Sequence, residues 1–187
     1  MASLRSVAHW LQKRMASPFH LSIMFRNGIP APPFSLSDEA KRLRALEELR
    51  ADKPLVLLFF RGAFCATSRR DLLAWSDLFE RIEWLGAGLV ALSVDAPDEL
   101  GRLKQTLELP FSLLSDADFS VSRTYGIYES DEREAGPQPH GEPGTFVLDR
   151  NGCFAFSQIQ SGPKGAANAN EILLMLLLMQ KQNGFYW

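Results

Sequence analysis

Apolar positions along the chain follow two different periodicities, and together they predict an α/β fold. A continuous apolar run over 55–60 and a second apolar segment over 89–94, with Ser93 as its one polar residue, have the length of strands buried in a sheet. Between them, the apolar residues of 68–85 recur every three or four positions, which is typical of an amphipathic helix. Another helix is predicted over 97–107, because Pro97 opens it and acids fill its first turn. Strand, helix, strand and helix in this order predict a parallel α/β core.

Shorter segments are predicted on either side of this core. The Gly- and Pro-rich residues 27–33 predict an irregular lead-in, and the spacing of leucines predicts a helix over 40–49. After the second long helix, we expect a short strand over 111–114 and a short helix over 116–125. The polar segment 129–143 is rich in Gly and Pro, so a mobile surface loop is predicted there.

The last third of the chain predicts a β-hairpin followed by a helix. Strand-like segments over 144–149 and 153–157 flank Asn151 and Gly152, a dipeptide favoured in two-residue turns because both positions need positive φ. An apolar helix over 167–180 is then expected to cover the sheet.

The N-terminal residues form a separate region, since 1–27 contain basic residues but no acid. A basic, acid-free, amphipathic start resembles an organelle transit peptide. A docked surface helix explains the same pattern, and we favour it. We therefore expect a helical extension over 1–27 and one domain over 28–187. The apolar residues on one predicted helical face are Leu4, Val7, Ala8, Leu11 and Met15.

Composition narrows the functional classes. A net charge of -2 over 187 residues gives no electrostatic reason to expect a nucleic-acid partner. With 2 cysteines the chain cannot form a disulfide scaffold, so we expect a reducing compartment, by default the cytoplasm. No Cys/His cluster has zinc-ligand spacing, and we expect no metal or other cofactor. The longest apolar run, 172–179, is too short to span a membrane.

One cysteine lies at a position that favours reactivity. Cys65 follows the first buried strand, where Gly62 leads into helical spacing. A thiol at a helix N-terminus feels the positive end of the helix dipole, which favours the nucleophilic thiolate. Positive charge nearby acts in the same direction, and Arg61, Arg69 and Arg70 supply it. The alternative is that Cys65 is a small buried apolar residue, as most unpaired cysteines are.

The predicted order of elements, with a cysteine after the first central strand, is that of the thioredoxin fold. Residues 28–181 resemble the peroxiredoxin-like branch of that superfamily, which includes the alkyl hydroperoxide reductases and the thiol-specific antioxidant proteins. The resemblance implies a thioredoxin-like α/β fold, with a central mixed sheet flanked by helices, and an oxidoreductase with a redox-active cysteine. It rests on the segments 28–36, 59–65, 92–95, 109–116, 125–127 and 145–152.

The active-site turn departs from the family pattern. Where thioredoxin-like relatives have C-x-x-C, Cys65 falls at the first cysteine and Ser68 at the second. Peroxiredoxins have T-x-x-C, with the peroxidatic cysteine at the position of Ser68. On this alignment Cys65 has no partner thiol in the turn, so an external thiol would have to restore it after oxidation. Cys153 is the other cysteine of the chain, and a packed strand residue is the favoured interpretation of it.

The resemblance also implies which residues surround the cysteine. Pro143 matches the cis-proline that faces the cysteine turn in thioredoxin-like proteins, although a sequence cannot show the isomer and an ordinary turn proline is the alternative. Phe64, Thr67, Pro143 and Gly144 would then line the substrate groove. Peroxiredoxins commonly have an arginine near Pro143, and we expect Arg123 and Arg150 to be surface charges rather than substitutes for it. No role is predicted for His9, His20 and His140.

Two functions fit these observations. In the first, the protein is a thiol-dependent oxidoreductase in which Cys65 attacks a peroxide or a disulfide, Ser68 donates a hydrogen bond to its thiolate, and a thioredoxin- or glutathione-like thiol regenerates it. In the second, it is a non-catalytic thioredoxin-fold module that binds partners through the N-terminal extension or the aromatic residues 185–187. A homodimer is compatible with both, because the fold leaves sheet edges and helix faces open.

Overall fold

The structure is a computed structural model that describes residues 26–130, 139–162 and 166–183. Most of the predicted N-terminal extension, 1–27, and the whole aromatic segment 185–187 lie outside these residues. No helix in the described part of the chain is both long and apolar enough to cross a membrane.

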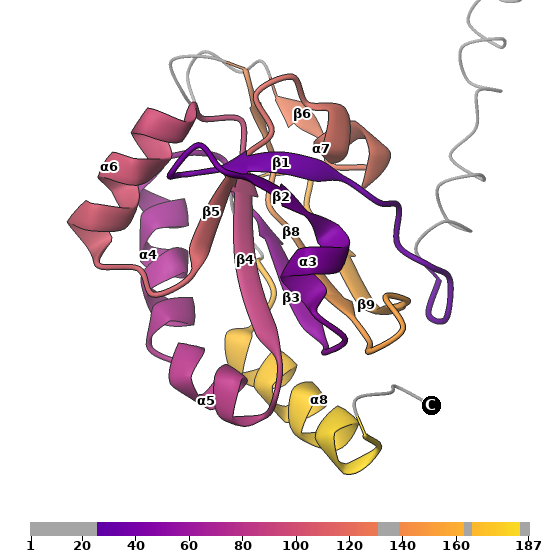
Figure 1. The fold of residues 1–187 in the computed structure, drawn as a ribbon. Helices are drawn as coiled ribbons and strands as arrows, with labels where there is room; N and C mark the ends of the chain where they lie inside the picture. The colour runs from indigo at the N-terminus through magenta and orange to yellow at the C-terminus, as the bar shows by residue number, and fades with distance from the viewer. Residues whose placement is uncertain (1–25, 131–138, 163–165, 184–187) are drawn as a thin grey trace, which may run out of the picture.

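A seven-stranded mixed sheet forms the centre of the domain, in the order β2-β1-β5-β4-β3-β8-β9 (Figure 1). β3, β4 and β5 run parallel, while β8 is antiparallel to β3, and β9 to β8. This arrangement confirms the predicted α/β fold and its central mixed sheet. The strands are β1 (Ser35–Asp38), β2 (Leu43–Ala45), β3 (Leu55–Phe59), β4 (Gly88–Ser93), β5 (Ser112–Ser115), β8 (Gly144–Leu148) and β9 (Phe154–Ile159).

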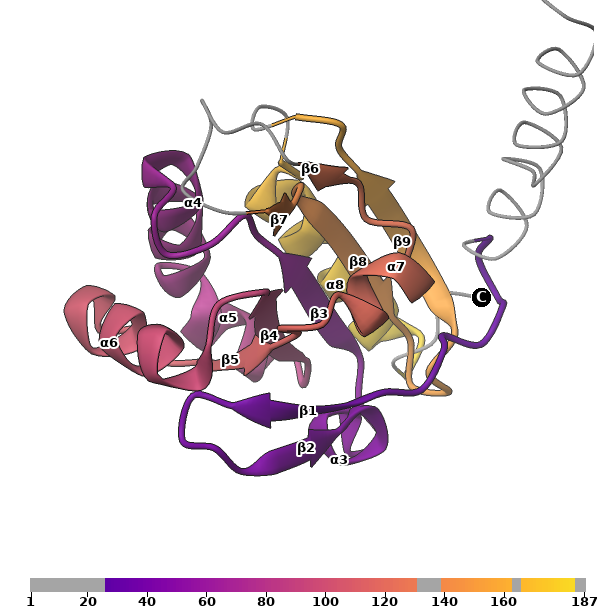
Figure 2. The same ribbon diagram turned by 90° about the horizontal axis from the view of Figure 1, so that it is seen from above.

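Helices cover both faces of the sheet, and α7 and α8 lie on opposite faces (Figure 2). One apolar core joins the sheet to α4, α5, α6 and α8, and the other joins it to α3, α7 and the lead-in. Every residue of β3 is buried, as its uninterrupted apolar run predicts. The helices are α3 (Leu46–Arg50), α4 (Ala66–Ser76), α5 (Phe79–Trp84), α6 (Pro97–Leu107), α7 (Ser120–Thr124) and α8 (Ala169–Lys181).

The predicted helix over 40–49 is wrong. Residues 35–45 form the hairpin β1–β2, and only the short α3 follows it. Asp38 determines the turn, because its buried carboxylate accepts hydrogen bonds from the backbone N–H groups of Ala40 and Arg42 and pairs with the Arg42 side chain. The leucine spacing resembled a helix only because short strands and turns can also place apolar residues at three-residue intervals.

The long helix predicted over 68–85 is interrupted. α4 ends at Ser76 and α5 begins at Phe79, and at the break the N–H of Leu78 donates to Trp75 O at 3.2 Å, a tighter turn than the α-helix has. The change of direction allows Trp75 and Ile82, 4% and 0% exposed, to enter the same core.

The segment predicted as a surface loop, 129–143, contains two short paired strands, β6 (Glu129–Ser130) and β7 (His140–Gly141). His140 and Glu142 are buried, so the prediction of a surface loop is wrong at this end. Both residues are buried because each of them contacts the buried side chain of Arg61.

The β8–β9 hairpin is confirmed, but its turn is longer than the predicted two residues. Asp149 O accepts from the N–H of Gly152, and its carboxylate accepts from the N–H groups of Asn151 and Cys153. Gly152 has a φ of 78°, whereas Asn151 is not among the described residues with positive φ. One glycine in the left-handed region is therefore enough to close the turn.

Candidate active site

The turn between β3 and α4 is held against the end of β4. The N–H of Ala63 donates to Asp95 Oδ2 at 2.8 Å, and the Ser93 hydroxyl donates to the same oxygen at 2.9 Å. Gly62 has a φ of 140°, and a Cβ there would lie 3.0 Å from Asp95 Oδ2. Burial raises the pKa of the Asp95 carboxyl, and the two hydrogen bonds only partly offset this. Glycine is thus required where the chain turns next to this carboxylate.

Cys65 occupies the position before the first residue of α4. Its backbone is extended, with φ -84° and ψ 113°, and its carbonyl accepts the N–H of Arg69 at 3.0 Å. Only 7% of the residue is exposed. Burial is the largest influence on the pKa of this thiol and raises it, but hydrogen bonds from Ser68 and Thr67 and the positive charge of Arg61 outweigh burial, so the pKa is lowered. Cys65 therefore favours the thiolate more than an ordinary cysteine does.

Ser68 lies one helical turn after Cys65 and faces it. Hydrogen bonding by its N–H and its hydroxyl lowers the pKa of the Cys65 thiol, while its oxygen accepts the N–H of Arg61 at 3.3 Å. The side chain is buried, with 4% exposed. The serine thus connects the end of β3 to the thiol at the place where C-x-x-C relatives have their second cysteine.

A buried polar cluster that the sequence did not predict lies next to this turn. Arg61 Nη2 donates to His140 Nε2 at 2.6 Å, and Arg61 Nε lies 3.4 Å from Glu142 Oε2. The exposed fractions of these residues are 4% for Arg61, 0% for His140 and 4% for Glu142. The ion pair between Arg61 and Glu142 keeps the guanidinium charge of Arg61 close to Cys65 within the protein interior. The signal in the sequence was Arg61 itself, a cation directly after a buried apolar run.

The residues predicted to line the groove are divided between two places. Phe64 and Thr67 are half-buried beside Cys65, and the ring of Phe64 lies 5.2 Å from that of His140. Pro143 is buried and, with Ser68, lines a cavity of about 30 Å³ between α4 and the start of β8. That volume accommodates a water molecule but not an organic substrate.

Pro143 and Gly144 differ from the expectation for a cis-proline groove. The Glu142–Pro143 bond is trans, since the described residues contain no cis peptide. Gly144 pairs with Phe59 in the sheet, and a Cβ on it would lie 2.3 Å from Ile127 Cδ1. Gly144 therefore allows close packing between β8 and Ile127.

The remaining candidates lie in other surroundings. Cys153 forms an isolated bridge with Pro30, and burial, followed by the charge of Asp149, raises the pKa of its thiol. Arg123 pairs with Glu129 at 2.5 Å on the surface, and Arg150 donates to backbone carbonyls at exposed positions. The contacts of all three fit the structural roles that the sequence predicts for them.

The fold and this site together define a thioredoxin-fold protein with a cysteine of lowered pKa at the start of the helix that follows β3. The model of the AhpC/TSA family matches residues 28–156. The chain belongs to this family, within the peroxiredoxin-like branch of the thioredoxin superfamily.

Relatives and solved structures agree with this assignment. The chain is 32% identical to "Peroxiredoxin Q, chloroplastic" of Sedum lineare over 67% of its own length and 64% of that protein. It is 30% identical to "Alkyl hydroperoxide reductase E" of Mycobacterium tuberculosis over 73% of its length and 87% of that protein. The chain thus spans less than two thirds of the chloroplastic relative.

Among solved structures, the fold is similar to peroxidoxin BcpB from Mycobacterium tuberculosis, with a TM-score of 0.70 at 20% identity, covering 84% of this chain and 97% of that one. It is also similar to a cysteine-to-serine mutant of peroxiredoxin 6 of Arenicola marina, with a TM-score of 0.73 at 18% identity, covering 84% and 74%. At these identities the similarity supports the fold alone.

Proposed function

We propose that this protein is a thiol-dependent peroxidase in which Cys65 is the nucleophile. The observation that carries the proposal is the lowered pKa of a buried thiol that accepts hydrogen bonds from Ser68 and Thr67 beside Arg61. Burial alone would raise that pKa, so these groups must favour the thiolate specifically. The similarity to proteins named peroxiredoxin Q and alkyl hydroperoxide reductase E supports a peroxide as the substrate rather than a disulfide.

The reaction is a two-electron oxidation of sulfur. The Cys65 thiolate attacks one peroxide oxygen, the S–O bond forms as the O–O bond breaks, and the other oxygen leaves as water or an alcohol after taking up a proton. Cys65 becomes a sulfenic acid and the peroxide is reduced. In this proposal Ser68 stabilises the thiolate, Phe64, Thr67 and Pro143 shape the approach to sulfur, and Gly144 holds Pro143 at the start of β8.

Regeneration requires two external thiols. The first attacks the sulfenic sulfur, which releases water and leaves a mixed disulfide, and the second attacks that disulfide and frees Cys65. The serine at position 68 cannot replace either thiol. A thioredoxin- or glutathione-like reductant in a reducing compartment such as the cytoplasm would supply them.

A non-catalytic module is the second candidate function. The observation that favours it is the 7% exposure of Cys65, because attack on a substrate requires access to the sulfur. The two functions differ in their dependence on Cys65: a binding module keeps its partner when Cys65 is replaced by serine, whereas a peroxidase loses its activity.

Peroxide consumption in the presence of an external thiol tests the proposal. Wild type and Cys153→Ser are expected to consume hydrogen peroxide or an alkyl hydroperoxide over many turnovers, and Cys65→Ser is expected to consume none. With the thiol omitted, intact-mass spectrometry should find one added oxygen on Cys65. If Cys65→Ser matches the wild type, or if peroxide leaves Cys65 unmodified, the proposal is wrong.

A further inference from the structure

One face of α8 is exposed although it is apolar at its centre. Leu174 and Leu178 are 60% and 55% exposed, and Glu171 and Lys181 flank them as exposed residues. At 100° per residue these four side chains lie within roughly 80° of the helix circumference, so they form a single stripe, which we call the α8 stripe. The opposite side of the helix enters the core through Ile172, Leu176 and Met179.

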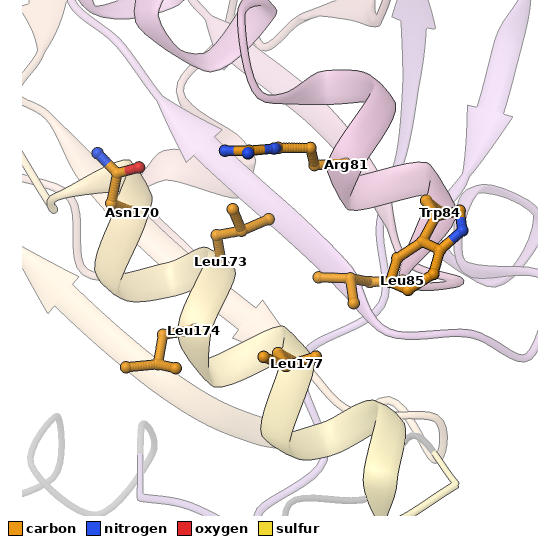
Figure 3. A pocket seen from close by; sticks show the side chains of 7 residues that line it. All are labelled: Arg81, Trp84, Leu85, Asn170, Leu173, Leu174 and Leu177. Carbon is orange, nitrogen blue, oxygen red and sulfur yellow. The ribbon is translucent and has the colours of Figure 1, made fainter.

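Apolar grooves flank the α8 stripe on both sides. The groove toward α5 has a volume of about 310 Å³, and Leu174 and Leu177 border it on α8 while Trp84 borders it on α5 (Figure 3). The groove on the other side has a volume of about 470 Å³ and is lined by Phe156 of β9 and by α8. Trp84 is 76% exposed. Apolar surface of this extent, with an exposed tryptophan at its rim, marks an interaction site.

The α8 stripe is symmetric about the level of Leu176. Leu174 and Leu178 lie two residues to either side of it, and Glu171 and Lys181 lie five residues to either side. When two such helices pack antiparallel around a twofold axis at this level, each Leu174 faces the partner copy's leucine at 178. Each Glu171 then faces the partner copy's lysine at 181. The stripe is therefore complementary to itself in shape and in charge.

We propose that the α8 stripe is the interface of a twofold homodimer, with α8 packing antiparallel against α8 of a second copy. The grooves give room for the flanking side chains of the partner copy, and Trp84 covers the edge of the contact. The self-complementary charges of the α8 stripe favour a second copy of this chain as the partner. An unrelated protein would need the same symmetric arrangement of acidic, apolar and basic side chains to match the stripe equally well. α5 and the end of α8 lie toward the ends at which the parallel strands β3 and β4 begin (Figure 1). Cys65 follows the other end of β3, so this interface leaves the Cys65 of each copy uncovered.

Sedimentation equilibrium of the full chain across the micromolar to millimolar range tests the interface. Wild type is expected to form dimers. Leu174→Arg/Leu178→Arg should weaken the dimer at least tenfold, while Leu43→Arg, at a leucine that is 69% exposed on β2, should leave it unchanged. Circular dichroism checks that each variant is folded.

Charge exchange provides a second test that does not depend on the leucines. Glu171→Lys and Lys181→Glu should each weaken the dimer, and the double variant should restore it. The two positions are about 15 Å apart along one helix, so only pairing between copies explains such a restoration. The proposal is overturned by a wild-type monomer throughout the concentration range, by a dimer that survives the arginine variants, or by failure of the double variant to recover. Flotation with phosphatidylcholine vesicles tests whether a lipid surface covers the α8 stripe instead. A wild type that stays monomeric and floats with the vesicles would also overturn the proposal.

Discussion

The groups that lower the pKa of the Cys65 thiol are close to it in the sequence. Ser68 and Thr67 donate hydrogen bonds, Arg61 contributes charge, and all three are within four positions of the cysteine. The sequence alone therefore predicted the helix start, the serine and the arginine. The contacts that hold Arg61 in place could not be predicted, because His140 is 79 residues away from it and lies in a polar segment.

Substitution at position 68 should separate activation of the thiol from its regeneration. Ser68→Ala removes the hydroxyl donor, and a hydrogen bond to a charged group contributes about 1.5–3 kcal/mol, so oxidation of Cys65 by peroxide should slow about tenfold or more at neutral pH. Stopped-flow kinetics would measure this rate. An unchanged rate would show that the hydroxyl does not stabilise the thiolate.

Ser68→Cys should give Cys65 the internal partner that it lacks. Side chains three positions apart at a helix start are close enough for a disulfide. After oxidation with peroxide, the variant should lose two hydrogens in intact-mass spectrometry and resist a thiol-alkylating reagent at Cys65, with Cys153→Ser as the common background. Persistence of a sulfenic acid in place of the disulfide would mean that the two positions are not juxtaposed.

The Arg61–Glu142 pair should affect stability and thiol chemistry separately. Arg61→Gln leaves the Glu142 carboxylate buried without its partner, and removing one member of a buried pair costs about 3–5 kcal/mol in the free energy of unfolding. Arg61→Gln/Glu142→Gln should recover much of that stability, because no uncompensated charge remains. In both variants the pKa of Cys65 should be higher than in the wild type, measured by thiolate absorbance. Recovery of the low pKa in the double variant would contradict the role of Arg61.

At the scale of elements, long buried segments were predictable and short hairpins were not. β3, β4 and α6 were predicted to within one residue, because their apolar patterns are long enough to distinguish strand from helix. The β1–β2 hairpin was missed since its turn depends on one buried carboxylate, Asp38, rather than on a periodicity.

The β3–α4 turn should be intolerant of a side chain at Gly62. Its φ of 140° suits glycine, and a Cβ would meet Asp95 Oδ2 and the Phe64 ring, each at 3.0 Å. Strain of this kind costs about 1–3 kcal/mol, so Gly62→Ala should lower the midpoint of urea unfolding accordingly. Gly101→Ala is the matched control: this glycine is inside α6, where the new methyl group has room, and stability should rise by up to about 1 kcal/mol. Equal effects of the two substitutions would contradict the account of the turn.

For the whole molecule, one buried tyrosine connects the lead-in to the sheet. The Tyr125 hydroxyl donates to Pro32 O at 2.8 Å, and its ring contacts Phe34, Phe59 and Phe146. The sequence predicted the irregular lead-in, but nothing in its periodicity indicated that the residue after α7 would hold it. A contact across 93 positions becomes visible only in the folded chain.

Replacement of Tyr125 should therefore destabilise the whole domain. Tyr125→Phe removes one hydrogen bond and should cost about 1 kcal/mol in the free energy of unfolding, whereas Tyr125→Ala also empties the centre of the aromatic cluster and should cost about 3–5 kcal/mol. Urea unfolding followed by circular dichroism measures both. If Tyr125→Ala lowered the free energy of unfolding by less than Tyr125→Phe does, the aromatic cluster would not stabilise the fold.

The central claim is that Cys65 is an activated thiol, and its rate of oxidation by hydrogen peroxide as a function of pH tests this most directly. In the Cys153→Ser background, the rate should exceed that of free cysteine at pH 7 and should fall with decreasing pH around a midpoint below about 8.5, the ordinary pKa of cysteine. The sign follows from the lowered pKa, because the reactive thiolate then persists to lower pH. A rate no faster than that of free cysteine, with a midpoint at or above the ordinary value, would contradict the claim.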